Sequence, residues 1–168
     1  EQTNLIADFS KPYCLPLIER GKHSDLKAIT HQTLVDVLRG GYSEVVGRYT
    51  IVDCRYPYEY EGGHIKGAIN LYTKQAVINE LMYNSNEYLS RERNKRSIII
   101  FHCEFSSERG PKMNRYLRNR DREANGDNYP QLVYPEIYLL EHGYKEFFQH
   151  HRCHCTPASY VPMLDERY

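Results

Sequence analysis

The chain has 168 residues with 22 basic and 22 acidic side chains, and its mean hydropathy is −0.71. This length suits one domain, which buries about two-thirds of the unfolded chain's surface and needs no disulfide to hold its core. No run of about 18 apolar residues occurs, which excludes a membrane span, and the balanced charge disfavours a globally basic nucleic-acid binder.

The first half of the chain predicts two helices and two short strands. Residues 1–25 carry scattered hydrophobic residues among prolines, which indicates irregular structure lying on the domain. Residues 30–40 place apolar side chains near helical spacing, with Thr30 as the expected N-cap. The other expected elements are a strand over 49–54, a loop over 55–67, a strand over 68–72 and a helix around 73–83.

The second half contains the clearest strand of the sequence. Residues 97–102 (SIIIFH) include four consecutive apolar residues, which suit a parallel strand covered on both faces. Then follow an expected loop over 103–109, a helix from about 110 to 124, a short strand from 132 with a bend at Pro135, and a helix over 143–150. The alternation of strands and helices predicts an α/β fold with a mainly parallel sheet.

Five cysteines cannot all pair with one another, and Cys14, Cys54 and Cys103 lie far apart in the sequence. These features indicate a reducing, intracellular compartment. The chain begins with Glu1 rather than Met and shows no signal or transit segment, so we expect it to be a domain of a longer protein.

The segment 97–118 carries the chemistry. A buried strand ends at His102-Cys103, five residues follow, and then come Arg109, Gly110-Pro111 and a helix. A strand, a short loop and a helix start point backbone N–H groups at one spot, where the helix dipole adds positive potential. This arrangement predicts an anion site that the guanidinium of Arg109 closes.

Cys103 lies at the mouth of this expected site. A thiol at a helix N-terminus beside an arginine is expected to have a pKa of about 3.5–7.5 and to be a thiolate near neutral pH. The predicted reaction is in-line attack of Cys103 on a phosphate monoester, followed by hydrolysis of the phosphocysteine. Ser106 or Ser107 could hydrogen-bond the sulfur and help it to leave. The alternative is that Cys103 is a buried core cysteine and Arg109 a surface residue, neither with a catalytic role.

The motifs HCEFSSERGPKM and DCRYPYEYEGGHIKGAINL resemble the catalytic domain of the M-phase inducer (cell-division-cycle) dual-specificity phosphatases. The resemblance extends over nearly the whole chain and implies a rhodanese-like fold, with a central, mainly parallel five-stranded sheet and helices on both faces. It implies a single domain over 1–168, with a regulatory N-terminal region and a C-terminal tail outside the chain. It also implies removal of phosphate from adjacent phospho-Thr and phospho-Tyr of cyclin-dependent kinases, without a metal or other cofactor.

By this resemblance, Cys103 is the nucleophile and Arg109 binds the phosphate. The loop residues that match the phosphate cradle are Glu104, Phe105, Ser106, Ser107 and Glu108. Cys54 matches a second cysteine of the family. We expect it to capture oxidised Cys103 in a disulfide, and the alternative is that Cys54 is a small buried hydrophobic residue.

The general acid has three candidates: Glu104, Glu108 and Asp53. Two carboxylates that face a phosphate dianion would repel it, so the alternative for both glutamates is that their side chains point outward. The alternative for Asp53 is that it forms a turn held by an ion pair with Arg55. We select Glu104, and a substrate that brings its own proton is the alternative.

A run of basic residues follows the loop, with six basic residues and one acidic residue between 109 and 122. At helical spacing, one arc carries Lys112, Arg115, Arg118 and Arg122. The resemblance favours a docking surface for a cyclin-dependent kinase–cyclin complex, whereas the alternatives are a solvated helix face or a nucleic-acid site. We expect a monomer, in the nucleus and cytoplasm, that binds neither nucleic acid nor membrane.

Two further patterns invite other interpretations. His64, in GGHIKGAIN, is better explained as part of a turn than as a catalytic group. The tract HHRCHC (150–155) places neighbours on opposite sides of an extended chain, which disfavours a zinc site, so we expect no metal. The remaining alternatives are a sulfurtransferase, disfavoured because seven rather than six residues run from Cys103 to Arg109, and an inactive rhodanese-like binding module.

Overall fold

The structure is a computed structural model that describes residues 5–18 and 25–164. A five-stranded sheet, all of whose strand pairs are parallel, runs through the domain in the order β1-β6-β5-β2-β4. Its strands are β1 (Ala28–Ile29), β2 (Val46–Asp53), β4 (Ile69–Asn70), β5 (Arg96–His102) and β6 (Ile137–Leu140). This architecture confirms the expected α/β class with a parallel five-stranded sheet.

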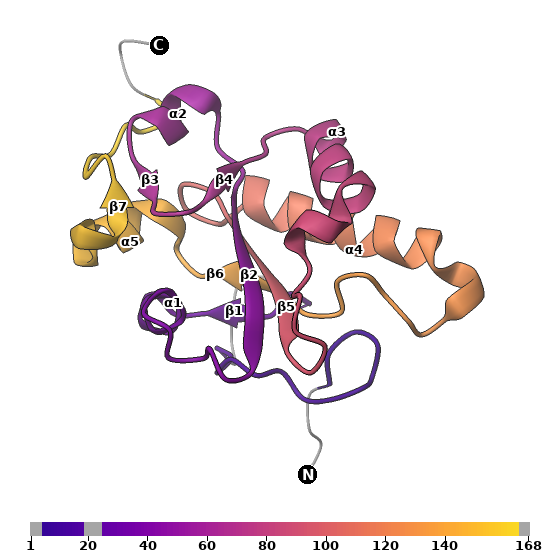
Figure 1. Cartoon of the computed structure of the whole chain (residues 1–168). Helices are drawn as coiled ribbons and strands as arrows, with labels where there is room; N and C mark the ends of the chain where they lie inside the picture. The colour runs from indigo at the N-terminus through magenta and orange to yellow at the C-terminus, as the bar shows by residue number, and fades with distance from the viewer. Residues whose placement is uncertain (1–4, 19–24, 165–168) are drawn as a thin grey trace.

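Helices cover both faces of the sheet (Figure 1). On one face lie α1 (His31–Leu38) and α5 (Gly143–His150), and on the other lie α3 (Lys74–Val77) and α4 (Arg109–Ala124). The strands alternate between the two cores: Ile98 and Ile100 of β5 pack with α1 and α5, whereas Ile99 and Phe101 pack with α4. The sheet is therefore buried on both sides, as the apolar run at 97–102 predicts.

Short helical segments complete the fold. They are α2 (Pro57–Glu61), the π-helical turn η1 (Ile78–Tyr83) and the 3₁₀ turns η2 (Ser85–Tyr88), η3 (Gly126–Asn128) and η4 (Arg152–His154). The region 55–67, expected to be loop, contains α2 and also β3 (His64–Ile65), which pairs with β7 (Cys155–Thr156). This small antiparallel sheet brings the C-terminal segment next to the loop that follows β2.

The strand expected from residue 132 begins later, and that prediction is wrong by five residues. Asp121, buried at the end of α4, accepts the backbone N–H groups of Val133 and Tyr134 at 2.9 and 2.8 Å. Those donors are therefore unavailable to a sheet ladder, and Pro135 has no N–H to offer. The chain enters the sheet only at Ile137.

The other expected elements lie close to their predicted places. Thr30 caps α1, accepting the N–H of Thr33 at 3.1 Å. The expected strand at 49–54 starts at Val46. Of the N-terminal region expected to be irregular, 5–18 form an isolated bridge between Leu5 and Pro12, and 19–24 lie outside the described residues. None of the helices in the described ranges is long and apolar enough to cross a membrane.

The central strands set the position of the site. β2 and β5 are paired in register up to Asp53 opposite His102, so the next residues, Cys54 and Cys103, leave the same edge of the sheet. Functional side chains gather at this carboxyl edge of parallel strands in open α/β sheets.

Candidate active site

The loop between β5 and α4 wraps around the sulfur of Cys103. Gly110, in the first turn of α4, donates its backbone N–H to Cys103 Sγ at 3.1 Å. A Cβ at position 110 would lie 3.2 Å from the carbonyl carbon of His102, a tight contact that would push the helix start away from the loop by a few tenths of an ångström. Cys103 is 2% exposed and also borders the apolar core beneath α4. The sulfur thus sits at the positive end of α4.

Helix α5 braces the same loop from the other side. The N–H groups of Tyr144 and Lys145 donate to the carbonyl oxygens of Cys103 and Glu104 at 2.9 and 3.0 Å. Gly143 adopts φ +68°, and a Cβ there would lie 2.5 Å from the backbone carbonyl oxygen of Glu104. The loop therefore depends on a left-handed glycine in direct contact with it.

The loop that is expected to bind phosphate has backbone N–H groups that make no hydrogen bond within the described residues. Within the described residues, the backbone N–H groups of Glu104, Phe105 and Ser106 donate to no protein acceptor. Ser106 is buried at φ 54°, and its hydroxyl also has no partner in the described structure. Consecutive free amides around a left-handed residue form the concave arrangement that binds anions.

Arg109 closes this loop and is held by a residue that the sequence analysis missed. Its Nη1 and Nη2 donate to the two carboxylate oxygens of Glu59 at 2.6 and 3.1 Å. Burial opposes the charged form, but the bonds to Glu59 outweigh it and raise the pKa of Arg109. Because both Nη atoms face Glu59, the Nε side of the fork is left for a bound oxyanion.

Aromatic side chains flank the mouth of the site. The guanidinium carbon of Arg109 lies 5.5 Å from the centre of the Tyr56 ring, and Tyr56 packs edge-on against Tyr72. On the loop itself, Phe105 is 51% exposed, with Lys145 Nζ 5.5 Å from its ring. Phe105 thus faces solvent rather than the core.

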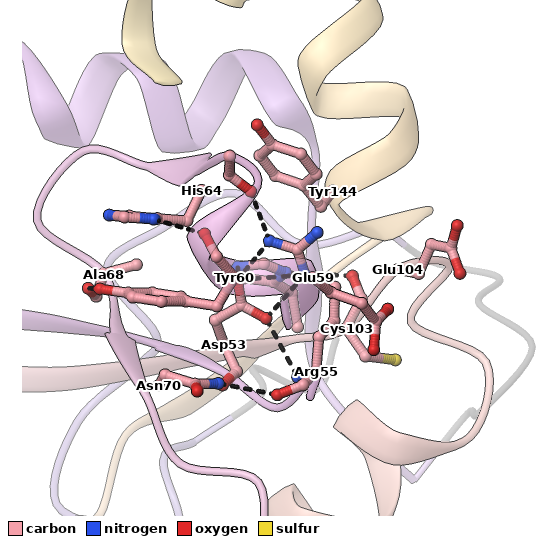
Figure 2. A network of polar contacts seen from close by, with 12 residues as sticks. Asp53, Arg55, Glu59, Tyr60, His64, Ala68, Asn70, Cys103, Glu104 and Tyr144 are labelled. Carbon is pink, nitrogen blue, oxygen red and sulfur yellow. Dashed lines mark hydrogen bonds and ion pairs between the residues drawn. The ribbon is translucent and has the colours of Figure 1, made fainter. Parts of the chain in front are cut away.

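The side chain of Glu104 is buried, whereas that of Glu108 is exposed. Glu104 is buried, accepts a hydrogen bond from the hydroxyl of Tyr160, and accepts the Met163 N–H at 3.4 Å. Its carboxylate lies 3.9 Å from Arg109 Nη2 and points away from the Cys103 sulfur (Figure 2). In an in-line displacement the proton donor must reach the leaving oxygen, which lies across phosphorus from the sulfur, whereas Glu104 is buried and bonded to Tyr160 and Met163.

Behind the loop lies a buried ionic network (Figure 2). Asp53 binds Arg55 through two oxygens, and Arg55 also donates to the Gly63 carbonyl at 2.8 Å. Burial raises the pKa of Asp53, but His102 and Arg55 outweigh it and hold that pKa below its usual value. The expected ion pair is therefore present, but Asp53 is fully buried rather than at the phosphate site.

His102 connects this network to the nucleophile. Its Nδ1 lies 3.0 Å from the Cys103 carbonyl oxygen, which can only accept, so this nitrogen carries the hydrogen. Burial lowers the pKa of His102, which favours the neutral ring. Its Nε2 has no hydrogen-bond partner among the described residues and lies 3.9 Å from Asp53.

Cys54 follows β2 directly beside this network. Its N–H donates to the His102 carbonyl at 2.9 Å, and it shares the apolar core with Cys103. Adjacent strands place opposite Cα atoms about 4.8 Å apart, within the range that a disulfide can bridge. Burial, followed by the neighbouring Cys103, raises the pKa of the Cys54 thiol well above its usual value.

The basic residues of α4 do not form one exposed stripe, which corrects the sequence-based picture. Arg118 is 14% exposed, donates to the Tyr134 carbonyl at 2.7 Å, and has its pKa lowered to about 10 by burial. Arg115 pairs with Asp25 at 2.8 Å. Only Lys112 and Arg122 of the four expected docking residues are exposed.

A cleft of about 410 Å³ lies between α4 and the N-terminal segment. Its lining includes Phe9, Tyr13, Arg115, Arg118 and Arg122. Three of the four expected docking residues therefore border a hollow rather than a flat helix face.

The histidine-rich patterns are accounted for locally. His64 Nδ1 lies 2.8 Å from the Tyr60 carbonyl oxygen and its ring stacks on Tyr60, so its structural role is confirmed. In the HHRCHC tract, Cys155 is buried in β7 whereas Cys153 is exposed. Over the described ranges, the structure contains no group of three or more His, Cys, Asp or Glu side chains that could hold a metal ion.

The fold and the cysteine loop define the class of protein. Residues 42–150 match the rhodanese-like domain family, and the chain belongs to that family. Two solved structures share the fold: the As-Sb reductase of Leishmania major (TM-score 0.55, 23% identity, 74% of this chain and 77% of that chain) and Ygr203w, a yeast protein tyrosine phosphatase of the rhodanese family (0.54, 20%, 82% and 94%).

Curated proteins of higher sequence identity show which members of this class the chain resembles. The chain is 55% identical to the M-phase inducer phosphatase of Drosophila melanogaster, over 99% of this chain and 36% of that protein. It is 51% identical to M-phase inducer phosphatase 1 of Mus musculus, over 97% and 30%, and 49% identical to M-phase inducer phosphatase 2 of Homo sapiens, over 100% and 28%. The chain spans about a third of the length of these relatives.

Proposed function

We propose that this chain is the catalytic domain of a dual-specificity protein phosphatase that removes phosphate from phospho-Thr and phospho-Tyr of cyclin-dependent kinases and promotes mitotic entry. The observation that carries the proposal is the Cys103 sulfur at the start of α4, below free loop amides and beside Arg109. The identity of 49–55% to M-phase inducer phosphatases supports the substrate class.

In the proposed reaction, the Cys103 thiolate attacks phosphorus in line with the leaving oxygen. The P–O bond to the substrate breaks, an S–P bond forms, and the freed alcohol or phenol departs. Water then attacks phosphorus, which releases inorganic phosphate and regenerates the thiolate. The amides of 104–106 and the Nε side of Arg109 stabilise the three equatorial oxygens, where charge is spread in the transition state.

The leaving oxygen also needs a proton. Glu104, the acid selected from the sequence, is hydrogen-bonded to Tyr160 and faces away from the sulfur. These contacts favour the alternative, in which the substrate brings its own proton. Asp53 is fully buried and bound to Arg55, so it cannot reach the substrate, and Glu108, exposed at the N-cap of α4, is the remaining carboxylate candidate.

Oxidation supplies a second proposed reaction of Cys103. Peroxide converts the thiolate to a sulfenic acid, with hydroxide as the leaving group. Cys54 then attacks this sulfur, forms a disulfide and expels water, so that higher oxidation is prevented. The adjacent positions of the two residues after β2 and β5 support the pairing, and Cys54 as a purely apolar core residue is the alternative.

We propose that docking on a kinase–cyclin complex uses Arg115 and Arg122, which line the cleft beside α4, together with the exposed Lys112 on the same helix. Arg118 supports this surface from a buried position. The proposed protein is a monomer of the nucleus and cytoplasm. A sulfurtransferase is disfavoured because the loop is one residue too long, and an inactive binding module is disfavoured because Cys103 and Arg109 are both present.

One assay tests the central proposal. The wild-type chain and Cys103→Ser are compared on a peptide that carries adjacent phospho-Thr and phospho-Tyr, with phosphate release as the measurement. We expect release by the wild type and none by Cys103→Ser. Equal release by both, or none by either together with sulfur transfer from thiosulfate to cyanide, would overturn the phosphatase function.

A further inference from the structure

The C-terminal segment 159–163 crosses behind the catalytic loop and is fixed there from two elements. Tyr144 of α5 donates its hydroxyl to the Ser159 carbonyl at 2.6 Å, and Tyr58 of α2 donates to the Met163 carbonyl at 2.5 Å. A Cβ on Gly63 would lie 1.8 Å from the Ser159 oxygen, so the segment lies directly against that glycine. This segment is part of the scaffold of the site.

Tyr160 connects the segment to the loop. Its ring packs against Tyr144 and Phe148, with ring centres 6.0 and 6.2 Å apart, and its hydroxyl donates to Glu104 Oε2. Burial and this bond raise the pKa of Tyr160, which keeps the hydroxyl protonated as a donor. The other Glu104 oxygen accepts the Met163 N–H from the same segment.

The position of Glu104 matters because two carboxylates flank one guanidinium. Glu59 already occupies Nη1 and Nη2 of Arg109, and it is fixed in turn by the Tyr56 N–H at 2.9 Å. Glu104 Oε1 already forms a second, longer ion pair with Nη2 at 3.9 Å, and a small rotation of the carboxylate would shorten it. A second carboxylate on the guanidinium would compete with a phosphate dianion and repel it.

We propose that Tyr160 is a positioning residue for oxyanion binding: its hydroxyl holds the Glu104 carboxylate on the C-terminal segment and so keeps Arg109 available to the phosphate. The inference rests on the proposed function of this site, and the ligand class is a tetrahedral oxyanion. Without the hydroxyl, Glu104 Oε2 is left without its donor, and the carboxylate can compensate by drawing closer to Arg109, with which it already pairs at 3.9 Å.

The test uses tungstate as the oxyanion and measures its Kd by calorimetry, together with the steady-state kinetics of an aryl phosphate. In Tyr160→Phe we expect about tenfold weaker tungstate binding and a raised KM, with little change in kcat. Adding Glu104→Gln to Tyr160→Phe is expected to restore binding, because a neutral amide does not repel the anion. Tyr134→Phe is the matched control, since it removes a tyrosine hydroxyl bond to the Leu81 carbonyl away from the loop.

Wild-type tungstate affinity in Tyr160→Phe would overturn the inference. It would also fail if binding is lost and Glu104→Gln does not restore it, because Tyr160 would then act only on folding. A wild-type chain that binds tungstate but hydrolyses no phosphate ester would overturn the phosphatase proposal alone, and the tungstate comparison would still decide the role of Tyr160. Absence of tungstate binding by the wild type would overturn both.

Discussion

At the scale of single residues, the phosphate site depends on the planar guanidinium group of Arg109, which Glu59 holds in place. Glu59 fixes Nη1 and Nη2 of Arg109 and thereby aims the Nε side of the guanidinium. Lysine offers a single ammonium that cannot bind Glu59 and an oxyanion in this bidentate way. The guanidinium geometry, and not only its charge, is therefore needed.

Arg109→Lys tests this geometry. We expect kcat/KM on an aryl phosphate to fall about 100-fold, the effect of losing one well-placed donor to transition-state charge. The melting temperature serves as the control for folding, because Arg109 is only half-buried and lysine keeps the positive charge that balances the buried Glu59 carboxylate. A loss of less than threefold would show that charge alone suffices.

At the scale of elements, α5 and the catalytic loop form one unit through Gly143. Its φ is +68°, and a Cβ at this position would lie 2.5 Å from the backbone carbonyl oxygen of Glu104, so there is no room for a side chain. In Gly143→Ala we expect a loss of stability of about 1–2 kcal/mol from the left-handed backbone alone, and a lowered kcat because the loop must shift. Urea unfolding and aryl phosphate turnover measure the two effects. Gly126→Ala is the control, since a Cβ there meets nothing within 4 Å.

The face of α4 makes a second prediction at this scale. Lys112 and Arg122 are exposed, so Lys112→Glu with Arg122→Glu should leave the fold and aryl phosphate turnover intact. Turnover of the phosphorylated kinase–cyclin complex should fall at least about tenfold, because docking is charge-dependent. Arg118→Glu is unsuitable for this test, since it would bury a carboxylate against the Tyr134 carbonyl. An equal loss on both substrates would refute a docking role.

At the scale of the whole molecule, the sequence predicted what local patterns encode. Cys103, Arg109, the strand before them and the helix after them lie within one short segment, so their arrangement was readable. Glu59 and Tyr160 lie 50 and 56 residues from the loop residues they hold, and only the tertiary fold brings them there. The late start of β6 and the burial of Arg118 likewise depend on Asp121 and Tyr134, which no periodicity reveals.

The charge balance of the folded chain also predicts sensitivity to acid. Burial lowers the pKa of four histidines in the described structure, namely His31, His102, His151 and His154. In the unfolded chain these rings titrate near pH 6.5, so below about pH 6.5 the unfolded state binds more protons than the folded state. The free energy of unfolding should therefore fall as pH drops from 7.5 to 5.5. Asp53, with its lowered pKa, contributes only below about pH 4 and lies outside this window.

Urea unfolding at pH 7.5, 6.5 and 5.5 measures this slope, for which one fully titrating group contributes at most about 1.4 kcal/mol per pH unit. His31 and His151 face each other with ring centres 6.4 Å apart, beside His142 and His150, and Arg39 adds positive charge near His151. The hydrogen bond between His31 and the Glu141 carbonyl, together with the nearby Glu146, raises the pKa of His31, but burial outweighs both and the pKa stays lowered. The double variant His31→Gln/His151→Gln should show a shallower slope than the wild type, because two of the four groups no longer take up protons on unfolding. An unchanged slope in the double variant would mean that these two rings titrate alike in the folded and unfolded chain, and that acid acts through other groups.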